Sequence, residues 1–168
     1  MLTEAQAWQV LDTVPDPEVP VVSVVELGIV RELRCNEGEG GEGGITVVVT
    51  PTYSGCPATE VIGQTIRDSL LAAGAGAVEL ETRLDPAWTS DWIGEAAREK
   101  LRRYGIVPPS GRAAVGAAQP VRFVRKTLAC PHCGSTDTER LSEFGSTACK
   151  ATWRCKSCLE PFEYFKPI

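Results

Sequence analysis

Two Cys-x-x-Cys pairs near the end of the chain constrain its fold more than any other feature. The first lies in CPHCG and the second in CKSC, with 21 residues between them; the four cysteines are Cys130, Cys133, Cys155 and Cys158. Two intervening residues allow a tight turn to direct both sulfurs of a pair at one ion, and four thiolates complete a tetrahedral zinc site. Such a metal stabilises a module too small to fold by apolar burial alone. We therefore expect a zinc ribbon over residues 121–168.

Iron in the same site, as in a rubredoxin-like electron-transfer protein, is the alternative, because four thiolates do not distinguish the two metals. His132 is the only histidine, and its place between two ligands suggests that it points outward. Without a second imidazole, Ser-His or Cys-His nucleophilic catalysis has no base, so we do not expect an independent hydrolase. Cys149 is either a small buried residue or a further ligand, and Cys35 is expected in a strand core.

Length and charge limit the remaining classes. The 168 residues suit one ordinary domain plus a small one. Seven cysteines, with neither an export signal nor an apolar run of about 18 residues, indicate a cytoplasmic protein outside the membrane. Residues 1–120 carry 9 basic and 17 acidic side chains, whereas residues 121–168 carry 8 and 5. Because four thiolates around zinc offset most of that basic excess, nucleic-acid binding is not expected.

The first half of the chain begins with a helix and a hairpin. Thr3 and Gln6 form a capping-box pattern, which predicts a helix from about Glu4. After the proline-restricted segment DPEVP, VVSVVELGIVRELRC runs into a strand. The β-branched segment ITVVVT is expected to pair with that strand as a hairpin.

A strand-helix-strand unit follows the hairpin. The apolar stripe from Val61 to Leu70 predicts a helix, and AVELETRL alternates as a strand, which together indicate a parallel crossover. Thr89, Ser90 and Asp91 are candidate caps for a last helix through Tyr104. We predict an α/β (α+β) fold in which residues 1–107 form a small mixed sheet with flanking helices, residues 108–120 form a linker, and the zinc ribbon follows.

Three residues of the first domain are candidates for a second site. Cys56 precedes Pro57, so its thiol is expected near a helix N-terminus, where the thiolate is favoured. Asp16 and Glu18 alternate with prolines in DPEVP. The simpler interpretation makes Cys56 a half-buried turn residue and the two carboxylates turn formers. The functional one makes them part of a metal or docking site.

The sequence also resembles a known family. The segments DPEVPVVSVVELGIV, VVVTPTYSGCPATEVI and LDPAWTSDWIGEAAREKL resemble the SufT-like domain of iron-sulfur cluster assembly factors. With FGSTACKATWRCKSC and EPFEYFKPI, nearly the whole chain resembles the PaaD family, also called PaaJ, of the phenylacetyl-CoA epoxidase gene set. Cys56 matches the Gly-Cys-Pro turn of the assembly domain, and Asp16 and Glu18 match its acidic motif.

The resemblance implies a bacterial accessory protein of aerobic phenylacetate degradation. Its partners would be the epoxidase subunits, above all the iron-sulfur reductase whose cluster it would mature or deliver. A transient iron-sulfur cluster on Cys56 would need ligands from a second copy of the chain, from Cys149 or from a partner. The alternatives are a non-catalytic adaptor between subunits and a rubredoxin-like electron-transfer subunit.

Overall fold

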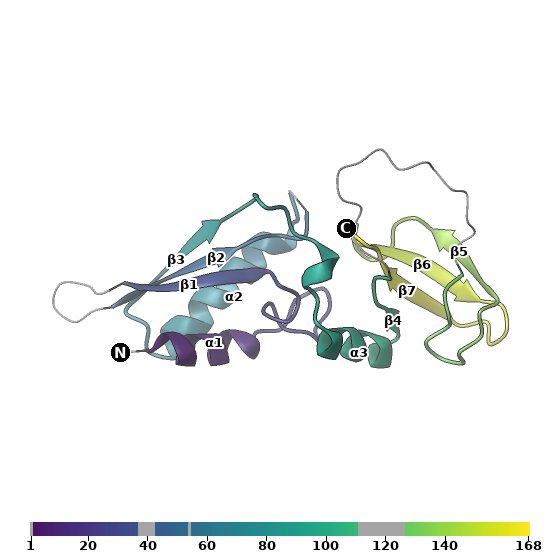
Figure 1. Cartoon of the computed structure of the whole chain (residues 1–168), viewed down its shortest axis with the longest axis horizontal. Helices are drawn as coiled ribbons and strands as arrows, with labels where there is room; N and C mark the ends of the chain where they lie inside the picture. The colour runs from purple at the N-terminus through teal and green to yellow at the C-terminus, as the bar shows by residue number, and fades with distance from the viewer. Residues whose placement is uncertain (1, 37–42, 54, 111–126) are drawn as a thin grey trace. The chain divides into compact units, whose positions relative to one another are not determined.

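The computed structural model describes residues 2–36, 43–53, 55–110 and 127–168 (Figure 1). The chain divides into two compact units, Met1–Trp88 and Thr89–Ile168. Each unit contains one small sheet with helices, which confirms the mixed α+β class predicted from the sequence. Within the described ranges, no helix is long and apolar enough to cross a membrane.

The first unit contains a three-stranded mixed sheet in the order β1-β2-β3. Strand β1 (Val30–Asn36) pairs antiparallel with β2 (Gly44–Val49), which confirms the predicted hairpin. Its loop, residues 37–42, lies outside the described residues. Strand β3 (Ala77–Thr82) pairs parallel with β2, and helix α2 (Ala58–Ala72) connects the two, as the periodicity predicts.

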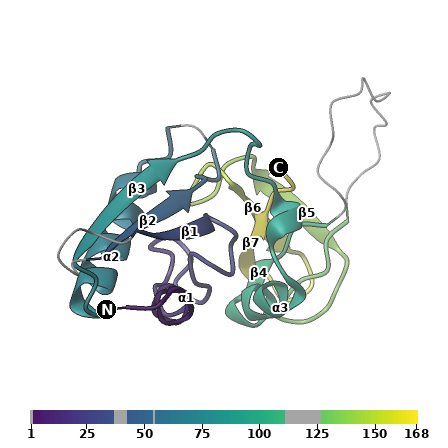
Figure 2. The same ribbon diagram turned by 60° about the vertical axis from the view of Figure 1, so that its left-hand side comes forward.

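Helices α1 and α2 lie against one face of this sheet (Figures 1 and 2). Helix α1 (Glu4–Asp12) begins with the predicted capping box, in which Thr3 and Gln6 bond each other's backbone N–H. Helix α2 approaches β3 closely at Gly63, where an added Cβ would lie 2.9 Å from Leu80 Cδ1. Apolar side chains of the helices and the sheet pack together in a core between the two layers. Its fully buried residues include Leu11, Val24, Val47, Ile66 and Leu70.

Ion pairs cover the opposite face of the same sheet. Arg83 Nη2 lies 3.0 Å from Glu32 Oε2 and 3.6 Å from Glu81 Oε1, and Arg34 pairs with both Glu32 and Glu81. Val48 of the central strand lies between Glu32 and Glu81 on this face and is nevertheless fully buried. The exposed charges contribute little energy, so their main effect is to keep this face polar.

Strand β1 begins later than the sequence pattern predicted. Residues before Val30 form turns, in which Ser23 Oγ accepts the Glu26 N–H at 3.0 Å and Glu26 Oε2 accepts the Ser23 N–H at 3.0 Å. The turn ends at Gly28, whose φ of +71° suits glycine. The two hydrogen bonds between Ser23 and Glu26 therefore stabilise a turn here, although the neighbouring valines favour a strand.

The second unit begins before the ribbon. It contains a four-stranded sheet in the order β4-β7-β6-β5, formed by β4 (Ile106–Val107), β5 (Thr138–Ser142), β6 (Lys150–Cys155) and β7 (Pro161–Phe165). The parallel pairing of β4 with β7 attaches helix α3 (Glu95–Tyr104) to this unit. The compact units divide after Trp88, because the pairing of β4 with β7, which was not recognisable in the sequence, places α3 in the second unit; the domain boundary after residue 107 stays a prediction.

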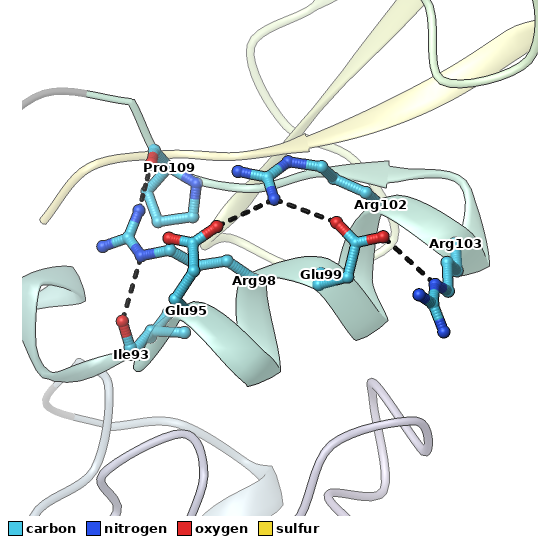
Figure 3. A network of polar contacts seen from close by, with 7 residues as sticks. All are labelled: Ile93, Glu95, Arg98, Glu99, Arg102, Arg103 and Pro109. Carbon is cyan, nitrogen blue, oxygen red and sulfur yellow. Dashed lines mark hydrogen bonds and ion pairs between the residues drawn. The ribbon is translucent and has the colours of Figure 1, made fainter.

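The predicted last helix is two helices. A 3₁₀ turn, η1 (Ser90–Trp92), has Thr89 as its N-cap. Helix α3 begins after Gly94 and ends, as predicted, at Tyr104, and its C-cap is Gly105 with φ of +91°. Arg98 joins these pieces, since its guanidinium donates to the carbonyl oxygens of Ile93 and Pro109 (Figure 3) and of Ser90.

Side-chain ion pairs run along α3 between Glu95, Glu99, Arg102 and Arg103 (Figure 3). These exposed pairs favour the helix while keeping its outer face polar. The start of the predicted linker, Pro108 and Pro109, is buried within the second unit. Residues 111–120 of that linker lie outside the described residues.

Candidate metal centre

The four predicted ligand cysteines come together in the second unit. Cys130 and Cys133 flank a turn before β5, Cys155 ends β6, and Cys158 lies in the turn before β7. Their sulfur atoms all lie within 4.8 Å of one another. Among the described residues this is the one group of three or more His, Cys, Asp or Glu ligand atoms that lie this close.

The sulfur spacing suits a tetrahedral ion. Cys130 Sγ and Cys158 Sγ are 3.7 Å apart, and Cys133 Sγ and Cys155 Sγ are 3.5 Å apart. A tetrahedron with metal-sulfur bonds of about 2.3 Å has sulfur-sulfur edges of roughly 3.8 Å. The donor set therefore fits one closed four-thiolate metal ion, with little movement of the side chains.

Backbone amides of the two turns point at the sulfurs. The His132 N–H donates to Cys130 Sγ at 3.4 Å, and the Cys158 N–H donates to Cys155 Sγ at 3.5 Å. The Cys158 amide is the largest cause that lowers the pKa of Cys155, to about 6. The Glu160 amide lowers the pKa of Cys158, but desolvation and the neighbouring thiols outweigh it and raise that pKa to about 12. Cys155 thus ionises more readily than Cys158, from which metal binding must displace a proton.

The two halves of the site differ in exposure and in backbone conformation. Cys130 and Cys155 are buried at 2% and 0% exposure, whereas Cys133 is exposed and Cys158 half-buried. The first turn is followed by Gly134 with φ of +76°, but the second is followed by Leu159 with φ of +66°. A leucine in the left-handed region is strained, so the second turn holds its shape at a conformational cost.

The other two cysteines with open roles lie elsewhere. Cys149 is buried and its sulfur lies 3.0 Å from Thr147 Oγ1, outside the four-sulfur group. Cys35 is exposed near the end of β1, which corrects the expectation that it lies in a strand core. It falls in the last part of the hairpin strand, where its neighbours Arg34 and Asn36 are exposed as well.

In the first unit, Cys56 lies one residue before Pro57, the N-cap of α2, and its side chain is buried. Its N–H donates to Tyr53 O at 3.3 Å, and its carbonyl accepts the Thr59 N–H at 3.1 Å. Gly55, with φ of +84°, permits the sharp entry to this turn.

Asp16 organises its own turn. Its Oδ1 accepts the N–H groups of Glu18 at 2.9 Å and Val19 at 2.8 Å, and the residue is buried at 6% exposure. Glu18 is half-buried. Cys56, Asp16 and Glu18 do not form a metal-binding group among the described residues. Within the described residues of the first unit, Cys56 is therefore not part of a ready-made group of three or more metal ligands.

Sequence reasoning missed a buried ion pair in the ribbon. Lys150 Nζ lies 2.8 Å from Glu163 Oε2, and the Lys150 side chain is only 2% exposed. Glu163 Oε1 also accepts the N–H and hydroxyl of Ser146, at 2.9 and 2.8 Å. The pair thereby fixes the segment FGSTACK between β5 and β6. In the sequence, Lys150 and Glu163 are isolated charged residues in strand segments, and nothing in the local pattern indicates that they pair.

Comparisons with known proteins extend these observations. Residues 117–166 match the family described as PaaD zinc beta ribbon domain, and residues 4–81 match the family described as iron-sulfur cluster assembly protein. The chain is 47% identical over 163 residues to an Escherichia coli (strain K12) protein provisionally named as a subunit of 1,2-phenylacetyl-CoA epoxidase. That alignment covers 97% of this chain and 92% of the relative. The chain belongs to the PaaD family.

Two further similarities concern the first part of the chain. A Porphyromonas gingivalis (strain W83) protein named Fe-S protein maturation auxiliary factor is 33% identical over 100 residues, covering 59% of this chain and 90% of the relative. The crystal structure of a domain of unknown function, DUF59, from Bacillus anthracis superimposes with a TM-score of 0.52 at 24% identity, covering 58% of this chain and 90% of that one. The latter supports the fold of the first unit.

Proposed function

We propose that this chain is a cytoplasmic accessory protein of 1,2-phenylacetyl-CoA epoxidase that matures or delivers the iron-sulfur cluster of the epoxidase's reductase subunit. The observation that carries the proposal is the union, in one chain, of an iron-sulfur assembly domain with the PaaD ribbon. The relative that is similar over almost the whole chain is named as an epoxidase subunit. The relative similar to the first 100 or so residues is named as a maturation factor.

In this proposal, Cys56 is the residue that holds the cargo. Its buried side chain lies one residue before Pro57, the N-cap of α2, in the Gly-Cys-Pro turn that the assembly domain and this chain share. Because the described residues of the first unit offer no group of three or more metal ligands around it, the remaining cluster ligands come from a second chain, from Cys149 or from the client. Incomplete ligation suits transfer, since a client with a full set of cysteines binds the cluster more tightly.

Asp16 and Glu18 have a supporting role in the proposal. Asp16 fixes the DPEVP turn through two backbone N–H groups, and so determines how the half-buried Glu18 is presented. We assign this turn to recognition of the partner rather than to metal ligation.

We further propose zinc as the resident ion of the ribbon. Zinc supplies structural cross-linking of the two turns and no redox chemistry. The chain's own contribution is the donor set itself, with two buried sulfurs and amide donors to Cys130 and Cys155. A rubredoxin-like role would instead require iron in this site, a red protein and a reversible redox couple.

Co-expression with the reductase subunit tests the proposed function. The reductase is purified after co-expression with the wild-type chain, Cys56→Ala or Cys35→Ala, and its iron, acid-labile sulfide and electron transfer are measured. Cys35 is the matched control because it is an exposed cysteine of the same unit. We expect Cys56→Ala to leave the ribbon metal in place while abolishing cluster insertion, and Cys35→Ala to behave as wild type.

The adaptor alternative makes the opposite prediction. If Cys56→Ala supports full cluster occupancy, whereas omission of the whole chain does not, the chain acts by docking epoxidase components and Cys56 is a turn residue.

A further inference from the structure

A pocket of about 650 Å³ lies in the second unit, away from the four sulfurs. Its lining includes Ala151 and Trp153 of β6, Tyr164 of β7, and the hydroxyl-bearing Thr136 and Thr138 beside β5. Aromatic and methyl groups thus stand next to hydroxyl groups in one open recess. This mixture is typical of pockets that combine apolar contact with a few oriented hydrogen bonds.

Trp153 lines this pocket, and its indole N–H has no hydrogen-bond acceptor among the described residues. Its side chain is 7% exposed, and its Nε1 is the one buried side-chain nitrogen or oxygen without a partner in the described part of the chain. Trp88, by contrast, donates its Nε1–H to Leu27 O at 2.9 Å. A buried indole N–H normally has an acceptor, and leaving it without one is costly. Trp153 therefore favours a ligand that supplies an acceptor oxygen.

The charged residues around the pocket are balanced in sign, which disfavours a strongly anionic or cationic ligand. The lining holds three basic residues and three acidic ones: Arg140, Lys156, Lys166, Asp137, Glu139 and Glu143. Lys156 Nζ lies 3.0 Å from Asp137, and Arg140 pairs with Glu143. With its charges already compensated, the rim offers no excess of either sign to a phosphate, a carboxylate or an ammonium group.

An exposed aromatic ring adjoins the same rim. Phe144 is 63% exposed, and Lys166 Nζ, from the pocket lining, lies 4.5 Å from the centre of its ring. The buried Lys150–Glu163 pair and the Ser146 bonds hold the segment that carries Phe144. A fixed, exposed aromatic residue beside a pocket is the arrangement that anchors a partner segment at a protein interface.

We propose that this surface, the Trp153 pocket with Phe144 at its edge, binds an uncharged peptide segment of a partner protein. A carbonyl oxygen of that segment accepts the Trp153 Nε1–H, and apolar side chains contact Ala151, Tyr164 and Phe144. Because Nε1 itself is covered, with less than 1 Å² accessible, the acceptor reaches it through a small adjustment of the lining side chains. A peptide suits the recess better than an enclosed metabolite, because the open rim lets a chain continue past it.

The indole N–H resonances of the ¹⁵N-labelled, metal-loaded full chain provide the test. Two pools of N-acetylated, C-amidated tetrapeptides are titrated in, one without charged side chains and one with Asp, Glu, Lys or Arg at the same positions. We expect the uncharged pool to shift the Trp153 Nε1–H signal saturably and downfield, while the charged pool does so much less. The Trp88 signal is the internal control and should not move, because its hydrogen bond is already made.

Variants separate this site from non-specific contact. Trp153→Phe keeps an aromatic ring without the donor and should weaken binding of the uncharged pool about tenfold, as expected for one hydrogen bond. Phe144→Ser should weaken it too, whereas Leu159→Ser, at a residue that is 71% exposed and does not line the pocket, should not. If Trp153→Phe fails to fold, the wild-type titration and the Phe144→Ser variant still show whether the uncharged pool binds at this pocket.

Several results would overturn the proposal. One is a Trp153 signal that neither pool moves, and another is an equal response to the charged and uncharged pools. Slow exchange of this N–H in the free protein would show that its acceptor is already present. An equally strong, saturable response to N-methylacetamide alone would assign the pocket to small amides rather than to a peptide segment.

Discussion

The buried pair Lys150–Glu163 allows a prediction whose magnitude follows from the structure. Glu163→Gln keeps a carbonyl oxygen for Ser146 but leaves the Lys150 ammonium, 2% exposed, without a carboxylate. Removing one partner of a buried pair costs about 3–5 kcal/mol. Because Glu163 itself is 26% exposed, the lower end of that range, about 3 kcal/mol, is appropriate.

Amide hydrogen exchange of the metal-loaded chain measures this loss where it occurs. At about 1.4 kcal/mol per factor of ten, exchange of the β6–β7 amides should accelerate roughly a hundredfold in Glu163→Gln. Lys150→Met combined with Glu163→Gln should recover most of the protection, since no charge then remains buried. Glu139→Gln breaks an exposed pair with Arg154 and should change exchange less than about fivefold. Equal effects of Glu163→Gln and Glu139→Gln would refute the reasoning.

Three further predictions follow from local geometry and charge. Partial burial raises the pKa of Glu163, but the bonds from Lys150 and Ser146 outweigh it, so its pKa lies below 4.5. The protection that Glu163 confers is therefore present above pH 4.5 and lost as the pH falls through its lower folded-state pKa, so wild type and Glu163→Gln should converge there in the same exchange experiment. Leu159→Gly should stabilise the metal-loaded ribbon by about 1 kcal/mol in denaturant titrations, since glycine adopts positive φ without strain; an unchanged midpoint would contradict this. Gly63→Ala should change the stability of the first unit by less than about 1 kcal/mol in thermal unfolding, because the only atom its Cβ would meet, Leu80 Cδ1 at 2.9 Å, ends a half-buried, flexible side chain and alanine favours the helix; a loss above about 2 kcal/mol would show that Leu80 cannot move aside.

Local sequence patterns predicted much of this fold. The Thr3–Gln6 capping box, the β-branched hairpin strand and the α2 stripe are each decided by neighbours in the chain, and each is present in the structure. The four cysteines meet because two short turns and one antiparallel sheet suffice to join them. Such features depend little on distant residues, so one sequence specifies them.

Features that depend on distant residues were not predictable. The two-residue strand β4 pairs with β7, more than fifty residues later, and so α3 belongs with the ribbon. In the sequence, Lys150 and Glu163 resemble ordinary surface charges, and only the pairing of β6 with β7 brings the two side chains together. The roles assigned to Cys56, Asp16 and Glu18 stay predictions, because they concern partners and cargo rather than this chain's own contacts.

Anaerobic transfer of a cluster to the reductase tests the central proposal most directly. The full chain, loaded with iron and sulfide, is mixed with the apo reductase subunit in the presence of a chelator that removes free iron, and the iron and acid-labile sulfide of the re-isolated reductase are measured. We predict that the wild-type chain fills the reductase while Cys56→Ala fills none of it. Equal filling by the two proteins, or none by the wild-type chain, would contradict the account.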